Sequence, residues 1–230
     1  MKIVDCLSKA RFALATRARK KRGRALIELI ARCSEIDREM TILDVGGRIR
    51  YWEEIGYAPP LGTKIVILNL PDDLPAGPVP QGFELVAGDA TDLSRYGEGQ
   101  FQLVVSNSVI GHVHTGGRPE ARRCMADGIR RIGRAYYVQT PNRAFPIDWR
   151  TGVVGFHWKS HEEQARILAR RNVGGRRCIP GYSSALGWVN SIHHLDQKEM
   201  AMLFSDGYFS SERFGGFIKS LIVIREPIVA

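Results

Sequence analysis

Short polar side chains and glycines follow successive apolar runs in the first half of this 230-residue chain. They are Asp44 with Gly46 and Gly47, Asn69 with Leu70, Asp89 with Ala90, and Ser106 with Asn107. If each run is a parallel strand, these residues gather at the carboxyl edge of one sheet, where open α/β folds bind ligands. Carboxylates, amides, hydroxyls and a closely approaching glycine backbone together suit a nucleotide-like molecule. The spacing therefore predicts a nucleotide-type pocket around residues 41–47.

Histidines are the second group of residues that could do chemistry. His112 and His114 follow the apolar run at residues 101–107, and imidazole exchanges protons near neutral pH. His112 is the first candidate for a polar substrate contact or general base and His114 the second, although His112 could equally pack against the next helix. His157 and His161 lie one helical turn apart, as zinc ligands can, but the Glu of a zinc-protease motif is missing. We therefore predict no metal site.

The elements that position these residues alternate between apolar runs and helical or loop segments, which predicts a doubly wound, mostly parallel sheet. Strands are expected at residues 41–45, 64–69, 83–87, 101–107 and 135–139. Helices are expected at residues 48–57 and 118–132. The prolines of residues 71–80 exclude a long helix and predict a surface loop with at most one helical turn.

The last third of the chain has a different pattern. Residues 143–195 are rich in aromatic residues and glycine without a clean period, and we expect an irregular insertion there. Its aromatic side chains form either a cap over the substrate or ordinary core: Phe145, Trp149, Phe156, Trp158, Tyr182 and Trp188. Asp196 is a plausible N-cap for a helix over residues 196–205. Residues 208–214 and 217–225, joined by two glycines, predict an antiparallel hairpin that completes seven strands.

The net charge of +9 is concentrated at the N-terminus. Residues 1–24 contain nine of the 33 Lys and Arg residues and a single acid, Asp5. A helical arm over residues 3–38 with a solvated basic face is favoured over binding to nucleic acid or anionic lipid. Four cysteines without paired spacing indicate a reducing compartment, and no apolar run is long enough to span a membrane. The sequence therefore predicts a cytoplasmic protein without a transmembrane segment.

Four motifs together connect the chain to a known family. They are Leu43-Asp-Val-Gly-Gly47, Gly88-Asp-Ala90, Ser106-Asn-Ser-Val-Ile-Gly-His112 and Thr140-Pro-Asn-Arg-Ala-Phe-Pro-Ile147. From about residue 41 onward the chain resembles the class I S-adenosylmethionine-dependent methyltransferases, and it is most similar to the small bacterial type 11-like branch. The resemblance implies a Rossmann-like sheet, S-adenosylmethionine (SAM) as cofactor, and S-adenosylhomocysteine (SAH) as product.

The resemblance also implies a role for each residue of the predicted pocket. Asp44 would hold the methionine ammonium directly or through water, while Gly46 and Gly47 would let the backbone pass beneath the amino-acid end. Asn69, where many relatives have an acid, would bond the ribose hydroxyls beside Leu70. The remaining roles fall to Asp89 for the adenine amino group, Ala90 for a ring nitrogen, and Ser106 and Asn107 for the sulfonium side.

On this interpretation residues 1–230 form a single methyltransferase domain. Its parts are a basic helical arm at 1–40, a cofactor-binding half at 41–142, a substrate cap insertion at 143–195, and a terminal helix and hairpin at 196–230. The expected reaction is in-line methyl transfer to a small organic or lipid-like acceptor. The family's longer glycine pattern is replaced by Arg48-Ile49-Arg50, its Glu by Gly111, and its Glu-Pro-His by Asp148-Trp149-Arg150.

These departures keep other functions open. A catalytically silent protein that binds SAM or SAH would explain Gly111 and the altered residues 148–150. A nucleic-acid methyltransferase could use the basic residues 1–24, although the nearly neutral remainder of the chain counts against it. A nicotinamide-dependent enzyme is disfavoured because it expects a third glycine and an acid at the end of the second strand.

Overall fold

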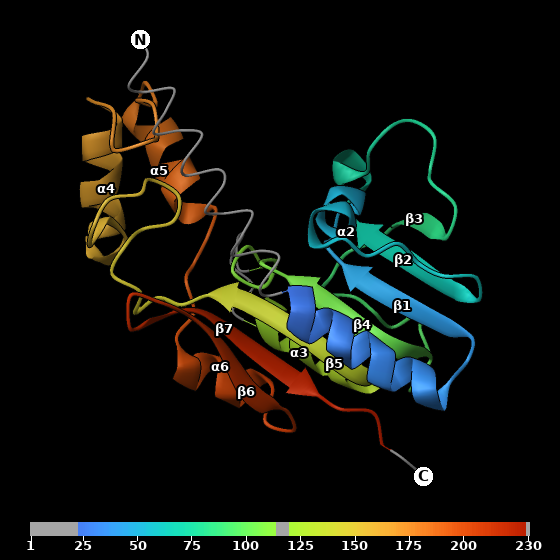
Figure 1. Cartoon of the computed structure of the whole chain (residues 1–230). Helices are drawn as coiled ribbons and strands as arrows, with labels where there is room; N and C mark the ends of the chain where they lie inside the picture. The colour runs from blue at the N-terminus through green and yellow to red at the C-terminus, as the bar shows by residue number, and fades with distance from the viewer. Residues whose placement is uncertain (1–22, 114–119, 229–230) are drawn as a thin grey trace. The chain divides into compact units, whose positions relative to one another are not determined.

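The computed structural model describes residues 23–113 and 120–228. Seven strands form one sheet in the order β3-β2-β1-β4-β5-β7-β6 (Figure 1). His114 and most of the basic arm at residues 1–24 lie outside the described residues, so their proposed roles remain predictions. Within the described ranges, no helix combines the length and apolar character needed to cross a membrane.

The strands and helices lie close to where the sequence predicts them. The strands are β1 (Met40–Val45), β2 (Thr63–Asn69), β3 (Phe83–Ala87), β4 (Phe101–Asn107), β5 (Gly133–Pro141), β6 (Tyr208–Phe214) and β7 (Phe217–Arg225). The helices are α2 (Ile49–Ile55), α3 (Ala121–Ile132), α4 (His161–Leu168), α5 (Tyr182–Asn190) and α6 (Gln197–Leu203), with residues 23–36 also helical. Short 3-10 turns occupy Pro71–Asp73, inside the predicted proline loop, and Phe156–Trp158.

The chain divides into two compact units. The first contains the described residues up to Ser106, Ile129–Tyr137 and the residues after 224. The second contains Asn107–Gly128 and Val138–Ile224.

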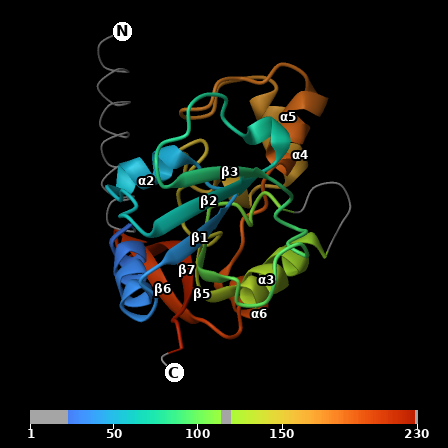
Figure 2. The ribbon, with the colours of Figure 1, turned by 90° about the vertical axis from the view of Figure 1, so that its right-hand side faces the viewer.

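The first unit is built on parallel strands. β1 pairs with β2 on one side and with β4 on the other, and β2 pairs with β3, all in parallel register. Figure 2 shows β1, β2 and β3 side by side with α2 close to them. Most residues of β1, β2 and β4 are buried, as expected for parallel strands that are covered on both faces. The parallel pairing places the carboxyl ends of these strands at one edge.

Helix α2 follows the glycine turn after β1 and buries one face of apolar side chains. It buries Tyr51, Trp52 and Ile55, and it ends at Gly56, whose φ of 78° is accessible to glycine at little cost. The N–H of Gly56 donates to Glu53 O, which closes the last turn. Helix α2 is shorter than the predicted 48–57 because Arg48 is extended and Gly56 stops it.

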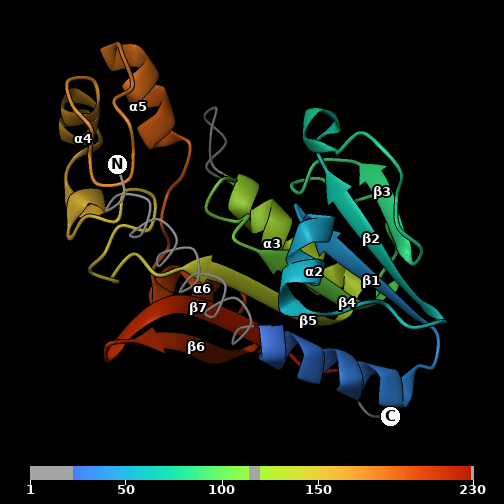
Figure 3. The ribbon, with the colours of Figure 1, turned by 45° about the horizontal axis from the view of Figure 1, so that its top comes forward.

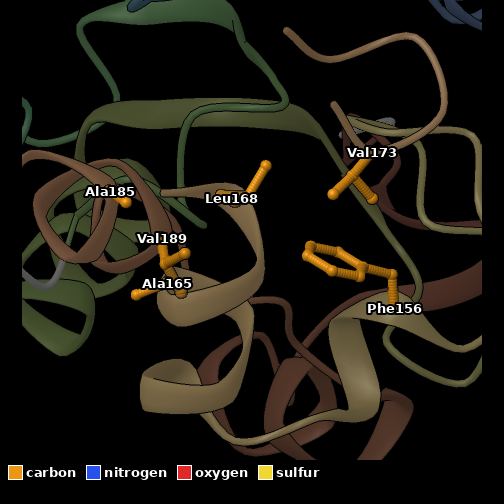
Figure 4. Close-up of a cluster of buried hydrophobic side chains, with 6 residues drawn as sticks. All are labelled: Phe156, Ala165, Leu168, Val173, Ala185 and Val189. Carbon is orange, nitrogen blue, oxygen red and sulfur yellow. The ribbon is translucent and has the colours of Figure 1, made fainter. Parts of the chain in front are cut away.

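The second unit contains two helices within residues 143–195, the segment expected to be irregular. Helices α4 and α5 pack side by side (Figure 3). Figure 4 shows the apolar cluster that they share, made of Phe156, Ala165, Leu168, Val173, Ala185 and Val189. Ser160 begins α4 by accepting a hydrogen bond from the N–H of Glu163. These helices have 8 and 9 residues, too short for an apolar period to stand out in the sequence.

The end of the chain confirms the predicted helix and hairpin. β6 and β7 pair in antiparallel register, and the turn residues Gly215 and Gly216 have φ of 56° and 84°. Two positive φ values in a row require the kind of turn that glycine favours. Helix α6 begins with a capping box, in which Asp196 accepts from the N–H of Glu199 and Glu199 accepts from the N–H of Asp196.

Replacement of Asp196 by alanine should lower the free energy of unfolding by about 1–2 kcal/mol, the usual cost of losing an N-cap side chain. Asp196 also pairs with Arg143, which adds to the loss. Urea unfolding followed by circular dichroism measures the change. Lys198→Ala, an exposed change in the first turn of the same helix, is the matched control and should leave the unfolding midpoint near that of the wild type.

Candidate functional site

Asp44 is buried at the carboxyl end of β1 and carries an oxygen without a donor. Its exposed fraction is 0%, and its Oδ2 accepts a hydrogen bond of 2.8 Å from Trp52 Nε1. No described residue donates to its Oδ1. Burial raises the pKa of Asp44 from 3.8 to about 7, while the Trp52 bond lowers it. Such a carboxylate needs a donor, and an ammonium group carries three.

The glycine pair lies directly over this carboxylate. Gly46 has a φ of 72° and donates its N–H to Leu68 O at 2.7 Å, which joins the turn to β2. A Cβ at Gly47 would lie 1.8 Å from Asp44 Oδ2, far inside van der Waals contact. Only glycine at position 47 lets the backbone cross above Asp44 in this way.

Asn69 at the end of β2 holds the glycine turn from the neighbouring strand. Its Nδ2 donates to Gly47 O at 2.9 Å. The aspartate or glutamate common at this position in relatives has no N–H to donate, so its oxygens would face the Gly47 carbonyl without a hydrogen. The asparagine therefore suits this turn, and Leu70 beside it is half exposed.

Asp89 lies at the end of β3, next to Asn69. The N–H of Gly88 donates to Asn69 O at 2.8 Å, so the ends of β2 and β3 are connected. Asp89 is exposed, and its Oδ1 accepts from Thr91 N at 2.8 Å, as in an Asx turn. Ala90 lies within the same turn. This bond accounts for the loop conformation, and contact with adenine remains a prediction.

The first unit thus brings together the predicted residues of three strand ends, from Asp44 and the glycine pair through Asn69 to Asp89. Ser106 belongs to the same unit, has an exposed fraction of 0%, and its Oγ has no partner among the described residues. Asn107 belongs to the second unit.

In the second unit, His112 is exposed and anchored to the segment after α5. Its Nδ1 lies 2.9 Å from Ser191 O, and a carbonyl only accepts, so Nδ1 carries the hydrogen. The Nε2 atom of the neutral ring is then an acceptor, as a general base requires. Gly111 beside it leaves little room for the glutamate of relatives, since a Cβ there would lie 3.2 Å from His193 O.

His157, His161 and His194 each make a hydrogen bond to a neighbouring group. His157 Nε2 is 2.9 Å from Arg143 O, and His161 Nδ1 is 2.7 Å from Asn190 Oδ1. His194 Nε2 accepts from Trp149 Nε1, and burial lowers its pKa to about 4. Within the part of the chain that the structure describes, no group of three or more potential metal ligands is found.

The aromatic side chains of residues 143–195 divide between core and surface. Phe145 and Phe156 are buried, and Phe156 belongs to the cluster in Figure 4. Trp149, Trp158 and Tyr182 are exposed, so these three remain candidates for a substrate cap. Core packing thus explains part of the predicted aromatic group.

Three residues of interest were not singled out by the sequence. Trp52 binds Asp44, and Ser108 is bonded to Gln139 at the ends of β4 and β5. Gln139 could have been found, because it is a polar residue that ends an apolar run, like Asn69 and Asn107. The sequence carries no comparable signal for Ser108.

No family model matches the chain, and no curated protein matches it. Among solved structures, the N-terminal domain of EvdMO1, determined in the presence of SAH and D-fucose, is 15% identical with a TM-score of 0.50, covering 91% of this chain and 83% of that one. Together with the seven-strand order and its antiparallel end, this decides the fold. The chain has the class I methyltransferase fold.

Two other solved structures, both named as methyltransferases, are also similar over most of the chain. A 1,6-didemethyltoxoflavin-N1-methyltransferase from Burkholderia thailandensis, with SAH bound, is 13% identical with a TM-score of 0.49, covering 97% of this chain and 84% of that one. A SAM-dependent methyltransferase from Methanosarcina mazei is 18% identical with a TM-score of 0.49, covering 81% and 91%.

Proposed function

We propose that this chain is a SAM-dependent methyltransferase that acts on a small organic or lipid-like acceptor. The observation that carries the proposal is the unpartnered Oδ1 of Asp44, buried beneath a glycine turn at the carboxyl edge of the sheet. A buried acceptor at that place suits the ammonium of a methionine moiety, whose charge also favours the ionised carboxylate. The fold and the motif resemblance support the same conclusion.

The other residues of the edge fit the rest of the cofactor. The backbone at Gly46 and Gly47 has no Cβ that would exclude the amino-acid end. Asn69 has a side-chain oxygen that can accept from a ribose hydroxyl while its Nδ2 holds Gly47 O. Asp89 is exposed at the next strand end and has a second oxygen available for the adenine amino group. Leu70 and Ala90 would flank these contacts.

The chemistry divides between cofactor and protein. The bound cofactor supplies a methyl group activated by a sulfonium. The protein binds and orients the two reactants in line, excludes water and, where the acceptor must lose a proton, takes it up. His112 is the first candidate for that proton because its Nδ1 donates to Ser191 O, which leaves Nε2 as the acceptor in the neutral form of the ring. His114 remains the second candidate.

The proposal predicts that SAH, but not NAD, raises the melting temperature. At a concentration of 100 times its Kd, SAH should add about 2.7 kcal/mol, or roughly 5–10 °C for a chain of this size. Asp89→Ala should remove most of this increase. Asp92→Ala is the matched control, since Asp92 makes the same kind of turn bond with the N–H of the residue two positions after it, Ser94. Differential scanning fluorimetry measures all four cases, and no increase with SAH would refute the proposal.

A silent SAM- or SAH-binding protein is the second candidate. The observation that favours it is the pair of arginines that follows the glycine turn, where the family resemblance would place further glycines. Arg48 is exposed, and Arg50 forms an ion pair with Glu54 at 3.0 Å. Labelled SAM incubated with fractionated extract of the source cells separates the two. An enzyme transfers label to an acceptor, whereas a silent protein binds SAH and transfers none.

A further inference from the structure

Ser108, directly after β4, has a backbone conformation that serine rarely adopts. Among the described residues it is the one non-glycine residue with a positive φ, 64°. The left-handed region costs an L-residue about 1–2 kcal/mol. Such conformations persist where the surroundings enforce them, and they gather at functional sites.

Two hydrogen bonds to Gln139 enforce this conformation. The N–H of Ser108 donates to Gln139 O at 2.8 Å, and its Oγ donates to Gln139 Oε1 at 2.8 Å. Gln139 lies near the end of β5, the strand beside β4, and has an exposed fraction of 1%. Because Ser108 occupies the carbonyl oxygen of the amide, it fixes the direction in which the amide NH₂ group points.

That NH₂ group is left without a partner. Gln139 Nε2 is buried and has no acceptor among the described residues, and Asn107 Oδ1, next to Ser108, is buried without a donor. Each such atom costs about 1–3 kcal/mol when it is shielded from water without a bond. Both residues belong to the second unit and lie at the carboxyl ends of neighbouring strands, the edge where α/β folds bind ligands.

We propose that Gln139 Nε2 and Asn107 Oδ1 bind the acceptor of the methyl transfer through a neutral group that both donates and accepts, a hydroxyl or an amide. Ser108 is the positioning residue that aims Gln139. The inference rests on the proposed methyltransferase function and deepens it by naming the substrate class. A carboxylate or phosphate oxygen would satisfy Gln139 but would leave Asn107 Oδ1 facing a second acceptor, so the pair selects against anions.

The test compares labelled-methyl transfer by the wild type and by variants, using labelled SAM and the active fraction of a source-cell extract. Gln139→Met removes the donor at similar volume. This variant should need more of the extract fraction, the source of the acceptor, to reach half of its maximal transfer rate. When the fraction is limiting, the rate of label transfer should be about 10- to 100-fold lower than that of the wild type, as expected for one lost hydrogen bond. Gln139→Glu keeps an acceptor for Ser108 Oγ and should show the same loss. SAH affinity, measured by calorimetry, should stay within twofold.

Gln102→Met is the matched control. Gln102 is also a strand glutamine, but its Oε1 is satisfied by Thr41 N at 2.8 Å, so this variant should lose stability and keep transfer per folded molecule. Ser108→Gly tests the positioning role, because glycine tolerates a positive φ and only the Oγ bond is lost. It should raise the half-saturating amount of fraction without lowering the melting temperature, a result that a purely structural serine would not give.

The outcomes separate this inference from the proposed function. In the first outcome, the wild type binds SAH and transfers label, and Gln139→Met transfers label equally well. The inference then fails and the methyltransferase proposal stands, and a buried water would satisfy Gln139 Nε2 and Asn107 Oδ1. If SAH binds but no fraction accepts label from the wild type, the inference is overturned and cofactor binding stands. If SAH does not bind, the proposed function itself is refuted.

Discussion

Gly47→Ala should abolish most of the affinity for SAH and lower the free energy of unfolding. The new Cβ would lie 1.8 Å from Asp44 Oδ2 and 2.0 Å from its Cγ, and Asp44 cannot move aside because it is buried and bonded to Trp52. Overpacking costs about 1–3 kcal/mol, and losing the Trp52 bond adds about 1–3 kcal/mol for a charged group. Urea unfolding measures the stability, and calorimetry measures the SAH affinity.

Gly187→Ala is the control with the opposite sign. Gly187 lies inside α5, and an ideal Cβ there meets no atom within 4 Å. The substitution should raise the free energy of unfolding by about 0.5–1 kcal/mol through helix propensity, with SAH affinity unchanged. An unfolding midpoint for Gly47→Ala equal to that of the wild type would show that the turn does not lie over Asp44 as described.

Asp44→Asn should remove a pH dependence of stability. Burial raises the folded-state pKa of Asp44 from 3.8 to about 7, so between these values the folded protein binds a proton that the unfolded chain releases. The contribution of Asp44 to stability should therefore be greatest below about pH 4 and be lost as the pH rises to 7. The total is about 4 kcal/mol, from 1.36 kcal/mol per pKa unit. Asparagine keeps an oxygen for Trp52 Nε1 and carries no charge, so the profile of the variant should lack this decline, while His194, whose pKa burial lowers to about 4, affects both proteins equally.

Urea unfolding at pH 5, 6, 7 and 8 measures the two profiles without cofactor. SAH should reverse the trend in the wild type, because its ammonium favours ionised Asp44, so affinity should rise with pH up to about 7. Asp44→Asn should bind SAH weakly at every pH. Parallel stability profiles for wild type and variant would contradict the assigned burial of the carboxylate, and unchanged SAH affinity would contradict its role as the ammonium partner.

The sequence predicted the sheet well because its elements are defined by local chemistry. The strand β3 and the hairpin strands β6 and β7 were predicted with their observed bounds. Asp196 was recognised as an N-cap from its residue type. The helices α4 and α5 were missed because their stability comes from contacts between them, such as Leu168 and Val189 in one cluster, rather than from a long apolar period.

The sequence also predicted which strand ends lie together, whereas the binding roles of their residues stay predictions. Asp44, Asn69 and Asp89 were singled out because each follows an apolar run, and parallel pairing brings such ends together. Ser108 and Gln139 were missed because their relation depends on a backbone angle and on a contact between residues 31 positions apart. Gln139 could have been singled out as a polar residue that ends an apolar run, but its bond to Ser108 leaves no trace in residue type or spacing, so only the folded arrangement reveals that bond.

The bond from Asn69 to the carbonyl of Gly47 makes two segments interdependent, although 22 positions separate them. With an acid at position 69, the carboxylate oxygens would face the carbonyl oxygen of Gly47 and repel it, unless the glycine turn changed its conformation. Among homologous chains, the amide at 69 and a truncated glycine motif should therefore co-vary. A double-mutant cycle between the two positions would show non-additive free energies, so restoring the family's usual residue at one position alone would be deleterious.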